Sequence, residues 1–204
     1  MAEETVGATV VRYIDELEGS LRYIHQMMEP DLGAAVAQVI EQKREQLGWA
    51  GEVSDVLDDP TWLSPGEWRM GDSSDDDFYL YASIENTGCA DGQDVETWIG
   101  TFCEFGGDGL CFEISTDALG KAVWKKLLAS QVETIGQLID LGFKCDPRTG
   151  FLGLPISIDR NLLADAFEND EFSLALQPIG LAIEQLNVAK PTLDKLIIEI
   201  RKFG

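Results

Sequence analysis

The chain has 204 residues, of which 45% are apolar, and its 37 acidic against 15 basic residues give a formal net charge of −22. The apolar fraction is typical of a globular chain and too high for a disordered one, and the length predicts one large domain or two small ones. The charge argues against direct binding to nucleic acid or to an anionic membrane, because such a protein repels both polyanions.

The negative charge is concentrated in the middle of the chain. The window from Glu45 to Asp117 holds eighteen acidic residues and one basic residue, Arg69, which is a net −17, whereas the rest of the chain contributes −5. A regional field of this kind attracts surfaces rich in lysine or arginine, and salt screens it.

The cysteine content and the N-terminus indicate a cytoplasmic protein. No apolar run approaches the roughly 18 residues that a membrane-spanning helix needs. The first residues are acidic, unlike the basic start of a secretory signal. The cysteines are few and form no C-x-x-C pair, so we expect thiols in a reducing compartment rather than a disulfide framework. They are Cys89, Cys103, Cys111 and Cys145.

The N-terminal quarter shows helical spacing. Apolar residues recur every three or four positions from Val6 to Met28, which predicts an amphipathic helix. We expect Pro30 to end this helix and Asp31 to cap a second one that stops at Gly48, so that residues 1–49 form a helical hairpin. Residues 50–77 are rich in proline, glycine and aspartate and are predicted to form a long acidic loop.

The hydrophobic period changes to two at residues 78–84, which predicts a strand. Two more strands are predicted at 96–105 and 110–115, joined by a hairpin turn in which Phe105 lies opposite Leu110. A helix capped by Ser115 or Thr116 is expected to follow from about residue 117 to Gly142.

The remaining segments complete the predicted fold. Strands at 143–145 and 151–158 flank a turn at 146–150, and Asp159 is expected to cap helical segments that run to the C-terminus. Pro178 predicts a kink or a local helix start, and Pro191 a first-turn proline. The order predicts an α+β fold with a single antiparallel sheet (three strands, helix, two strands), an N-terminal helical hairpin and C-terminal helices. Residues 1–49 and 50–204 are the predicted units, or one domain overall.

Catalytic and metal-binding patterns are weak. His25 is the only histidine, so a Ser-His-Asp triad or a histidine-rich metal site lacks its other members. The loop at 72–77 has Asp77 and Ser83 where an EF-hand requires glycine and glutamate, so we interpret it as a solvated run of charge, with weak divalent-cation binding as the alternative. Residues 106–109 lack the Lys-Ser/Thr of a phosphate loop. The E-x-K spacing at 41–43 resembles half a nuclease motif but lies in a predicted helix. We expect no enzyme activity, cofactor or resident metal.

Aromatic residues accompany the acidic region. Of the five tryptophans, all but Trp124 lie in or beside it, a combination typical of protein-binding surfaces, although the rings could equally belong to the core. In the predicted register Trp98 and Phe102 face away from the main apolar side. The residues expected to bind a partner are Asp58, Asp59, Trp62, Trp68, Asp75, Asp76, Asp77, Trp98, Phe102 and Glu104.

The element order from Phe78 to Phe203 is similar to that of the class I type III secretion chaperones and the related YbjN-type domains. The similarity rests on the strand at 110–114 leading straight into a helix and on the hairpin at 143–158 around its turn at 146–150. It implies a small, acidic, non-catalytic and usually dimeric protein, and the chaperones of this class bind extended polypeptides along apolar grooves. The chain differs in its additional N-terminal helices and in the acidic segment 50–77.

These observations lead to one hypothesis and two alternatives. We expect a non-enzymatic acidic protein-binding module, chaperone-like or inhibitory, whose region 52–113 engages a basic protein partner without contacting nucleic acid or membrane directly. The first alternative is a DNA mimic that inhibits a nucleic-acid-binding enzyme. The second is an uncharacterised enzyme, although the sequence supplies no coherent nucleophile, base and oxyanion donor.

Overall fold

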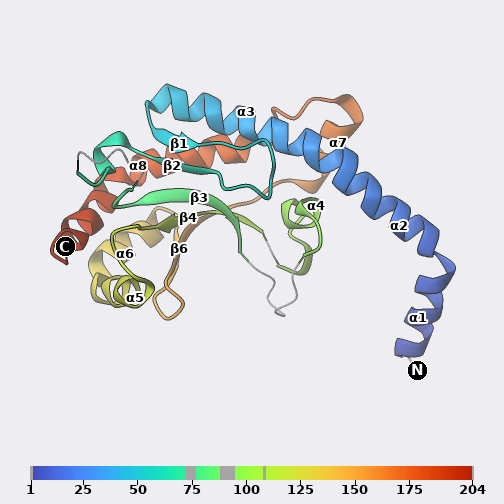
Figure 1. Ribbon diagram of the computed structural model, residues 1–204, viewed down its shortest axis with the longest axis horizontal. Helices are drawn as coiled ribbons and strands as arrows, with labels where there is room; N and C mark the ends of the chain where they lie inside the picture. Colours follow the sequence, from blue (N-terminus) through green and yellow to red (C-terminus); the bar gives the residue numbers. More distant parts are fainter. Residues whose placement is uncertain (1, 72–76, 88–94, 108, 204) are drawn as a thin grey trace.

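A computed structural model describes residues 2–71, 77–87, 95–107 and 109–203 (Figure 1). Six strands form one antiparallel sheet in the order β1-β2-β3-β4-β6-β5. This confirms the predicted α+β class with a single antiparallel sheet, although the strand count differs from the five predicted. The strands are β1 Ala50–Glu52, β2 Trp62–Ser64, β3 Tyr81–Asn86, β4 Leu110–Ser115, β5 Lys144–Asp146 and β6 Phe151–Ile156.

Helices precede, interrupt and follow the strands. The α-helices are α1 Ala2–Arg12, α2 Ile14–Tyr23, α3 Glu29–Leu47, α4 Trp98–Phe102, α5 Lys121–Ser130, α6 Val132–Asp140, α7 Arg160–Asn169 and α8 Gln177–Ile200. The shorter helical segments are the π-helical η1 Ile24–Met28 and the 3-10 turns η2 Gly66–Trp68 and η3 Phe105–Gly107.

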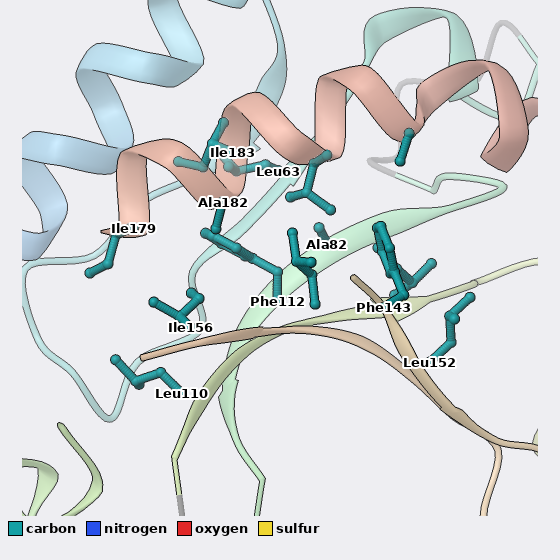
Figure 2. Packing of buried hydrophobic residues seen from close by; sticks show 14 of the residues in the cluster. Leu63, Ala82, Leu110, Phe112, Phe143, Leu152, Ile156, Ile179, Ala182 and Ile183 are labelled. Atoms are coloured by element: carbon teal, nitrogen blue, oxygen red, sulfur yellow. The ribbon is translucent and has the colours of Figure 1, made fainter. Parts of the chain in front are cut away.

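The main core lies between the sheet and α8. Alternate residues of β3, β4 and β6 point to this side, and Figure 2 shows Phe112 of β4 reaching toward α8 near Ala182. Phe112 is fully buried, and burying a side chain of this size contributes about 1.5–3 kcal/mol. Helix α3 packs on the other side of α8, where Val39 and Lys43 lie against Gly180, and its residues Leu32, Val36 and Ile40 are buried. The sheet is therefore covered on one face by α8, with α3 behind it.

The N-terminal helices do not form the predicted hairpin. Pro30 falls in the first turn of α3, and the chain continues from α2 through η1 into α3 as one long helical rod (Figure 1). Proline has no N–H and would break the α-helical hydrogen-bond ladder at this point. The π turn replaces that ladder just before Pro30, because the N–H of Glu29 bonds the carbonyl of Ile24 five residues back. Gly48 ends α3 as predicted, in the left-handed conformation.

The segment 50–77 is not a simple loop. Its first part forms the sheet edge, because β1 pairs with β2 and β2 with β3. The loop between β1 and β2 lies close against α3, where a side-chain carbon added at Gly33 would stand 2.1 Å from the carbonyl oxygen of Asp55. Residues 72–76, part of the predicted acidic run, lie outside the described residues.

The predicted strand at 96–105 is wrong. Thr97 accepts a hydrogen bond from the Gly100 N–H at 3.0 Å and so caps the short helix α4. The strand β4 instead pairs with β3, Tyr81 opposite Ser115, so the predicted register of Phe105 opposite Leu110 is wrong as well.

Several C-terminal predictions are confirmed. Strands β5 and β6 form a hairpin, and the Asp159 side chain caps α7 by accepting from the N–H groups of Asn161 and Leu162. The helix expected at 117–142 is two helices that meet at Gln131, and the first starts at Lys121. Pro178 starts α8 as predicted, but Pro191 lies inside this helix rather than in a first turn.

Candidate functional site

The candidate site is the face of the sheet opposite α8, called here the open face. One row of residues crosses all six strands on this face, each opposite the next in the strand register. In the spatial order β1, β2, β3, β4, β6 and β5, the residues of this row are Glu52, Trp62, Ser83, Glu113, Gly153 and Lys144. Because side chains alternate along a strand, this face is separate from the core face that carries Ala82 and Phe112.

Two adjoining hollows of about 670 Å³ and 430 Å³ lie along this face and share Tyr81, Glu113 and Ser115. Together they form what we call the sheet groove. Its lining residues used below are Glu52, Trp62, Tyr81, Glu85, Glu113, Ser115, Asp117, Asp146 and Phe151. The combined volume is in the range of sites that accept a small molecule or several side chains of a peptide.

Aromatic rings line the groove along much of its length. The ring of Trp62 lies 5.2 Å from that of Phe78 and 6.1 Å from that of Tyr81, the latter edge to face. At the other end, a side-chain carbon added at Gly153 would stand 2.7 Å from the tip of the Phe151 ring. Gly153 therefore leaves the space that Phe151 occupies. The partly exposed rings of Trp62, Tyr81 and Phe151 offer flat apolar contact and an attractive face for cations.

Carboxylates dominate the polar lining. Glu52, Glu85, Glu113, Asp117 and Asp146 line the groove against one basic residue, Lys121. Burial, followed by the repulsion from Glu85, raises the pKa of Glu113, and Lys121 only partly opposes these effects. The pKa of Tyr81 is also raised, first by burial and then by the negative charge of Asp117. Positive charge placed near Glu113 would relieve this repulsion.

Of the residues predicted to bind a partner, Trp62 lies in the sheet groove. Asp58 and Trp98 come together elsewhere, because the Trp98 indole Nε1 donates to Oδ1 of Asp58 at 2.7 Å. They line a separate hollow with His25 and Glu29. Asp59 is exposed nearby.

Two predicted contact residues are buried and cannot offer surface to a partner. Trp68 is 4% exposed and Phe102 is 1% exposed. The indole of Trp68 donates to Asp194 Oδ1 at 2.6 Å, and the Lys190 ammonium lies 5.8 Å from its ring centre. Both residues belong to the core, which was the alternative interpretation of the aromatic residues.

The remaining predicted residues are dispersed. Glu104 is exposed in the left-handed conformation, with φ of 54°, and accepts a hydrogen bond from the Ser157 hydroxyl at 2.6 Å. Asp77 is exposed. Asp75 and Asp76 lie outside the described residues.

The prediction missed Glu113, Glu85, Tyr81 and Phe151 as site residues. The signal was present in the alternation of β3 and β4, where Tyr81, Glu85 and Glu113 occupy the positions that do not face the core. The wrong partner strand for β4 concealed that these side chains share one face.

Catalytic and metal chemistry finds little support in the described part of the chain. Within it, no three His, Cys, Asp or Glu side chains converge on a common point. His25 Nδ1 bonds Glu29 Oε2 at 2.7 Å on the helical rod, and Glu41 of the E-x-K sequence is paired with Arg44 on α3. Over the same residues, no helix combines the length and apolar character needed to cross a bilayer.

Comparisons with models of protein families, with curated proteins and with solved structures gave no match. The resemblance to type III secretion chaperones therefore stays a prediction.

Proposed function

We propose that this chain is a non-enzymatic acidic protein-binding module, chaperone-like or inhibitory, that engages a basic polypeptide through the sheet groove. The observation that carries the proposal is the position of Glu113, a partly buried carboxylate beside Glu85, in a groove with aromatic walls. Lysine or arginine side chains fit this lining in two ways. Their charge neutralises the carboxylates, and their stems or guanidinium planes pack on Trp62 and Tyr81.

The same groove supports an inhibitory or a chaperone-like role. Carboxylates around the groove speed encounter with a basic partner, and the partly exposed rings supply contact area that holds it. A segment of extended chain has alternating side chains, which suits a groove that runs across strands. A folded partner would have to present a protruding basic loop.

The DNA-mimic alternative receives less support from the geometry. Two carboxylates on the same face of one strand stand about 7 Å apart when they are two residues apart, which is close to the phosphate spacing along one DNA strand. In the described strands that form the open face, β3 contributes Glu85 and β4 contributes Glu113, one carboxylate each. The acids are spread along the lining of a hollow, which favours reception of side chains over imitation of a phosphate ladder.

The test uses a labelled twelve-residue peptide in which arginine alternates with serine, titrated with the full chain and followed by fluorescence anisotropy. A second peptide replaces arginine by citrulline, which keeps the shape and removes the charge. We expect binding of the arginine peptide that weakens steeply between 50 and 500 mM salt, and at least tenfold weaker binding of the citrulline peptide. Equal affinity for both peptides would contradict the proposal.

Variants locate the site. Glu113→Gln should lower the affinity for the arginine peptide about tenfold, which corresponds to about 1.4 kcal/mol of binding free energy. The matched control is Glu168→Gln, an exposed position on α7 away from the groove lining, which should change the affinity less than twofold. A DNA mimic would instead compete with duplex DNA for a basic nucleic-acid enzyme, and the Glu113 substitution would leave this competition unchanged.

A further inference from the structure

The first part of the helical rod projects from the body of the molecule (Figure 1). Every residue from Val6 to Tyr23 is exposed. The exposed residues include large apolar side chains, among them Ile14 at 43%, Leu17 at 45% and Leu21 at 40%. Soluble monomers rarely expose a contiguous apolar face of this kind, so an unseen partner is expected to cover it.

The spacing of this face is that of a coiled coil. Val10, Ile14, Leu17, Leu21 and Ile24 follow each other at steps of four, three, four and three residues, the seven-residue repeat that keeps apolar side chains along one seam. We call these five residues the rod seam. The positions beside it include Val11, Tyr13 and Ser20, whereas Arg12, Asp15, Glu16 and Arg22 lie on the other side of the helix.

The rod also needs a partner for its own stability. Its sequence contains Gly7, Thr9, Val10, Val11 and Gly19, all poor helix formers that cost up to about 1 kcal/mol each relative to alanine. A single helix of such composition is marginal in water unless its apolar face packs. A Tyr13 with distorted dihedrals already separates α1 from α2.

We propose that the rod seam binds the same seam of a second copy of this chain, in antiparallel orientation. A twofold interface requires a surface that fits a second copy of itself. The seam meets this requirement because all five of its residues are apolar. With Leu17 beside the partner's Leu21, Ile14 meets the partner's Ile24. The antiparallel arrangement also places the two acidic bodies at opposite ends, which reduces their repulsion.

Charge disfavours a membrane surface as the occupant. The outer side of α2 carries Asp15 and Glu16, its flank carries Glu18, and the whole chain has a net charge of −22. Helices that lie on anionic membranes are instead rich in lysine and arginine on their polar face.

The size of the seam sets the expected strength. The seam from Val10 to Ile24 extends about 21 Å at 1.5 Å per residue and offers less than the ~800 Å² per partner of a standard interface. The dimer should therefore dissociate in the micromolar range, and its population should depend on protein concentration.

The test is sedimentation velocity of the full chain from 1 to 100 µM. We expect a monomer–dimer equilibrium that Leu17→Asp weakens at least tenfold, with unchanged near-ultraviolet circular dichroism of the tryptophans, all five of which lie in the body. The matched control, Gln26→Asp in η1, places the same charge on the exposed outer side of the rod and should leave the dimer intact. A chain that stays monomeric at 100 µM, or a dimer that Leu17→Asp leaves unchanged, would overturn the proposal.

Engineered disulfides test the orientation. In the antiparallel arrangement Leu17 lies beside the partner's Leu21, so a mixture of Leu17→Cys and Leu21→Cys chains should form the mixed disulfide faster than either chain crosslinks with itself. Faster crosslinking of Leu17→Cys chains with one another would overturn the antiparallel arrangement. Binding of the wild-type chain to phosphatidylserine vesicles through the seam would overturn self-association as its role.

Discussion

Trp98 donates twice, from its indole Nε1 to Oδ1 of Asp58 at 2.7 Å and from its backbone N–H to Oε1 of Glu29 at 2.6 Å. The first bond reaches the loop between β1 and β2, and the second reaches the helical rod. A helix of five residues such as α4 cannot hold itself together, so these bonds fix its position. Trp98 therefore joins three segments that are distant in sequence, and Asp58 is engaged by this ring.

Removing the indole N–H should loosen α4. Trp98→Phe is expected to cost about 1 kcal/mol of unfolding free energy, since the bond is charge-assisted but solvent-accessible. Hydrogen exchange should report faster amide exchange in residues 98–103. A double-mutant cycle with Asp58→Asn should show coupling, whereas a cycle with the neighbouring Asp59→Asn should show none.

Truncating the centre of the core should have the largest effect on stability. Phe112 is fully buried between the sheet and α8, so Phe112→Ala should cost about 3–5 kcal/mol by chemical denaturation. Phe203, which is 61% exposed, provides the control, and Phe203→Ala should change the unfolding free energy by less than about 0.5 kcal/mol. Similar losses for the two variants would contradict the packing described here.

Neutralising Glu113 should stabilise the isolated protein while it weakens partner binding. Burial and the charge of Glu85 raise the pKa of Glu113, so as the pH rises the folded state keeps this proton longer than the unfolded state does. The unfolding free energy therefore falls as pH rises through this window. Glu113→Gln should remove that fall and add about 0.2–1 kcal/mol at pH 7, the range for cross-strand charge pairs. Thermal melts at pH 4 to 7 measure it, and a loss of stability at pH 7 would contradict it.

Lys190 connects α8 to the turn η2. Its ammonium lies 2.9 Å from Glu67 Oε1 and 3.1 Å from Asp194 Oδ2. Two hydrogen bonds lower the pKa of Glu67. The larger effect comes from the backbone N–H of Glu67 itself, and the smaller one from the Lys190 ammonium. A lowered carboxyl pKa contributes stability above about pH 4.3 that is lost as pH falls further.

Lys190→Met should therefore cost about 1 kcal/mol at pH 7, and the difference from wild type should shrink below pH 4. Lys202→Met offers the comparison, because its partner Glu199 also lies on α8 but its own side chain is 61% exposed. That variant should differ from wild type by less than about 0.5 kcal/mol at every pH. A pH-independent loss for Lys190→Met would show that lost packing on Trp68, not charge, accounts for the effect.

Local signals in the sequence predicted the C-terminal half well. The turn at 146–150, the cap at Asp159 and the helix start at Pro178 each depend on residues a few positions apart, so a single sequence contains the whole signal. The α+β class followed from the change of hydrophobic period at residue 78.

The predictions were wrong where residues distant in sequence determine the secondary structure or the strand pairing. The strand predicted at 96–105 is wrong because the Thr97 cap and the bonds from Trp98 to Glu29 and Asp58 hold residues 98–102 as a helix. Pro30 marks a helix end by local rules, yet the preceding π turn carries the rod past it. The sheet groove was missed because it requires β6 beside β4, a pairing that the sequence pattern does not specify.

The strand order has a consequence for biosynthesis. Strand β6 is the last of the six to leave the ribosome, yet it sits between β4 and β5. A nascent polypeptide that ends near residue 140 can pair β1 through β4 but still has one side of β4 unpaired. Glu113 gains its neighbour across the ladder, Gly153, only after this late strand is inserted. Recognition by the open face therefore begins only after β6 has been synthesised, and shortened products that end before this strand would lack it.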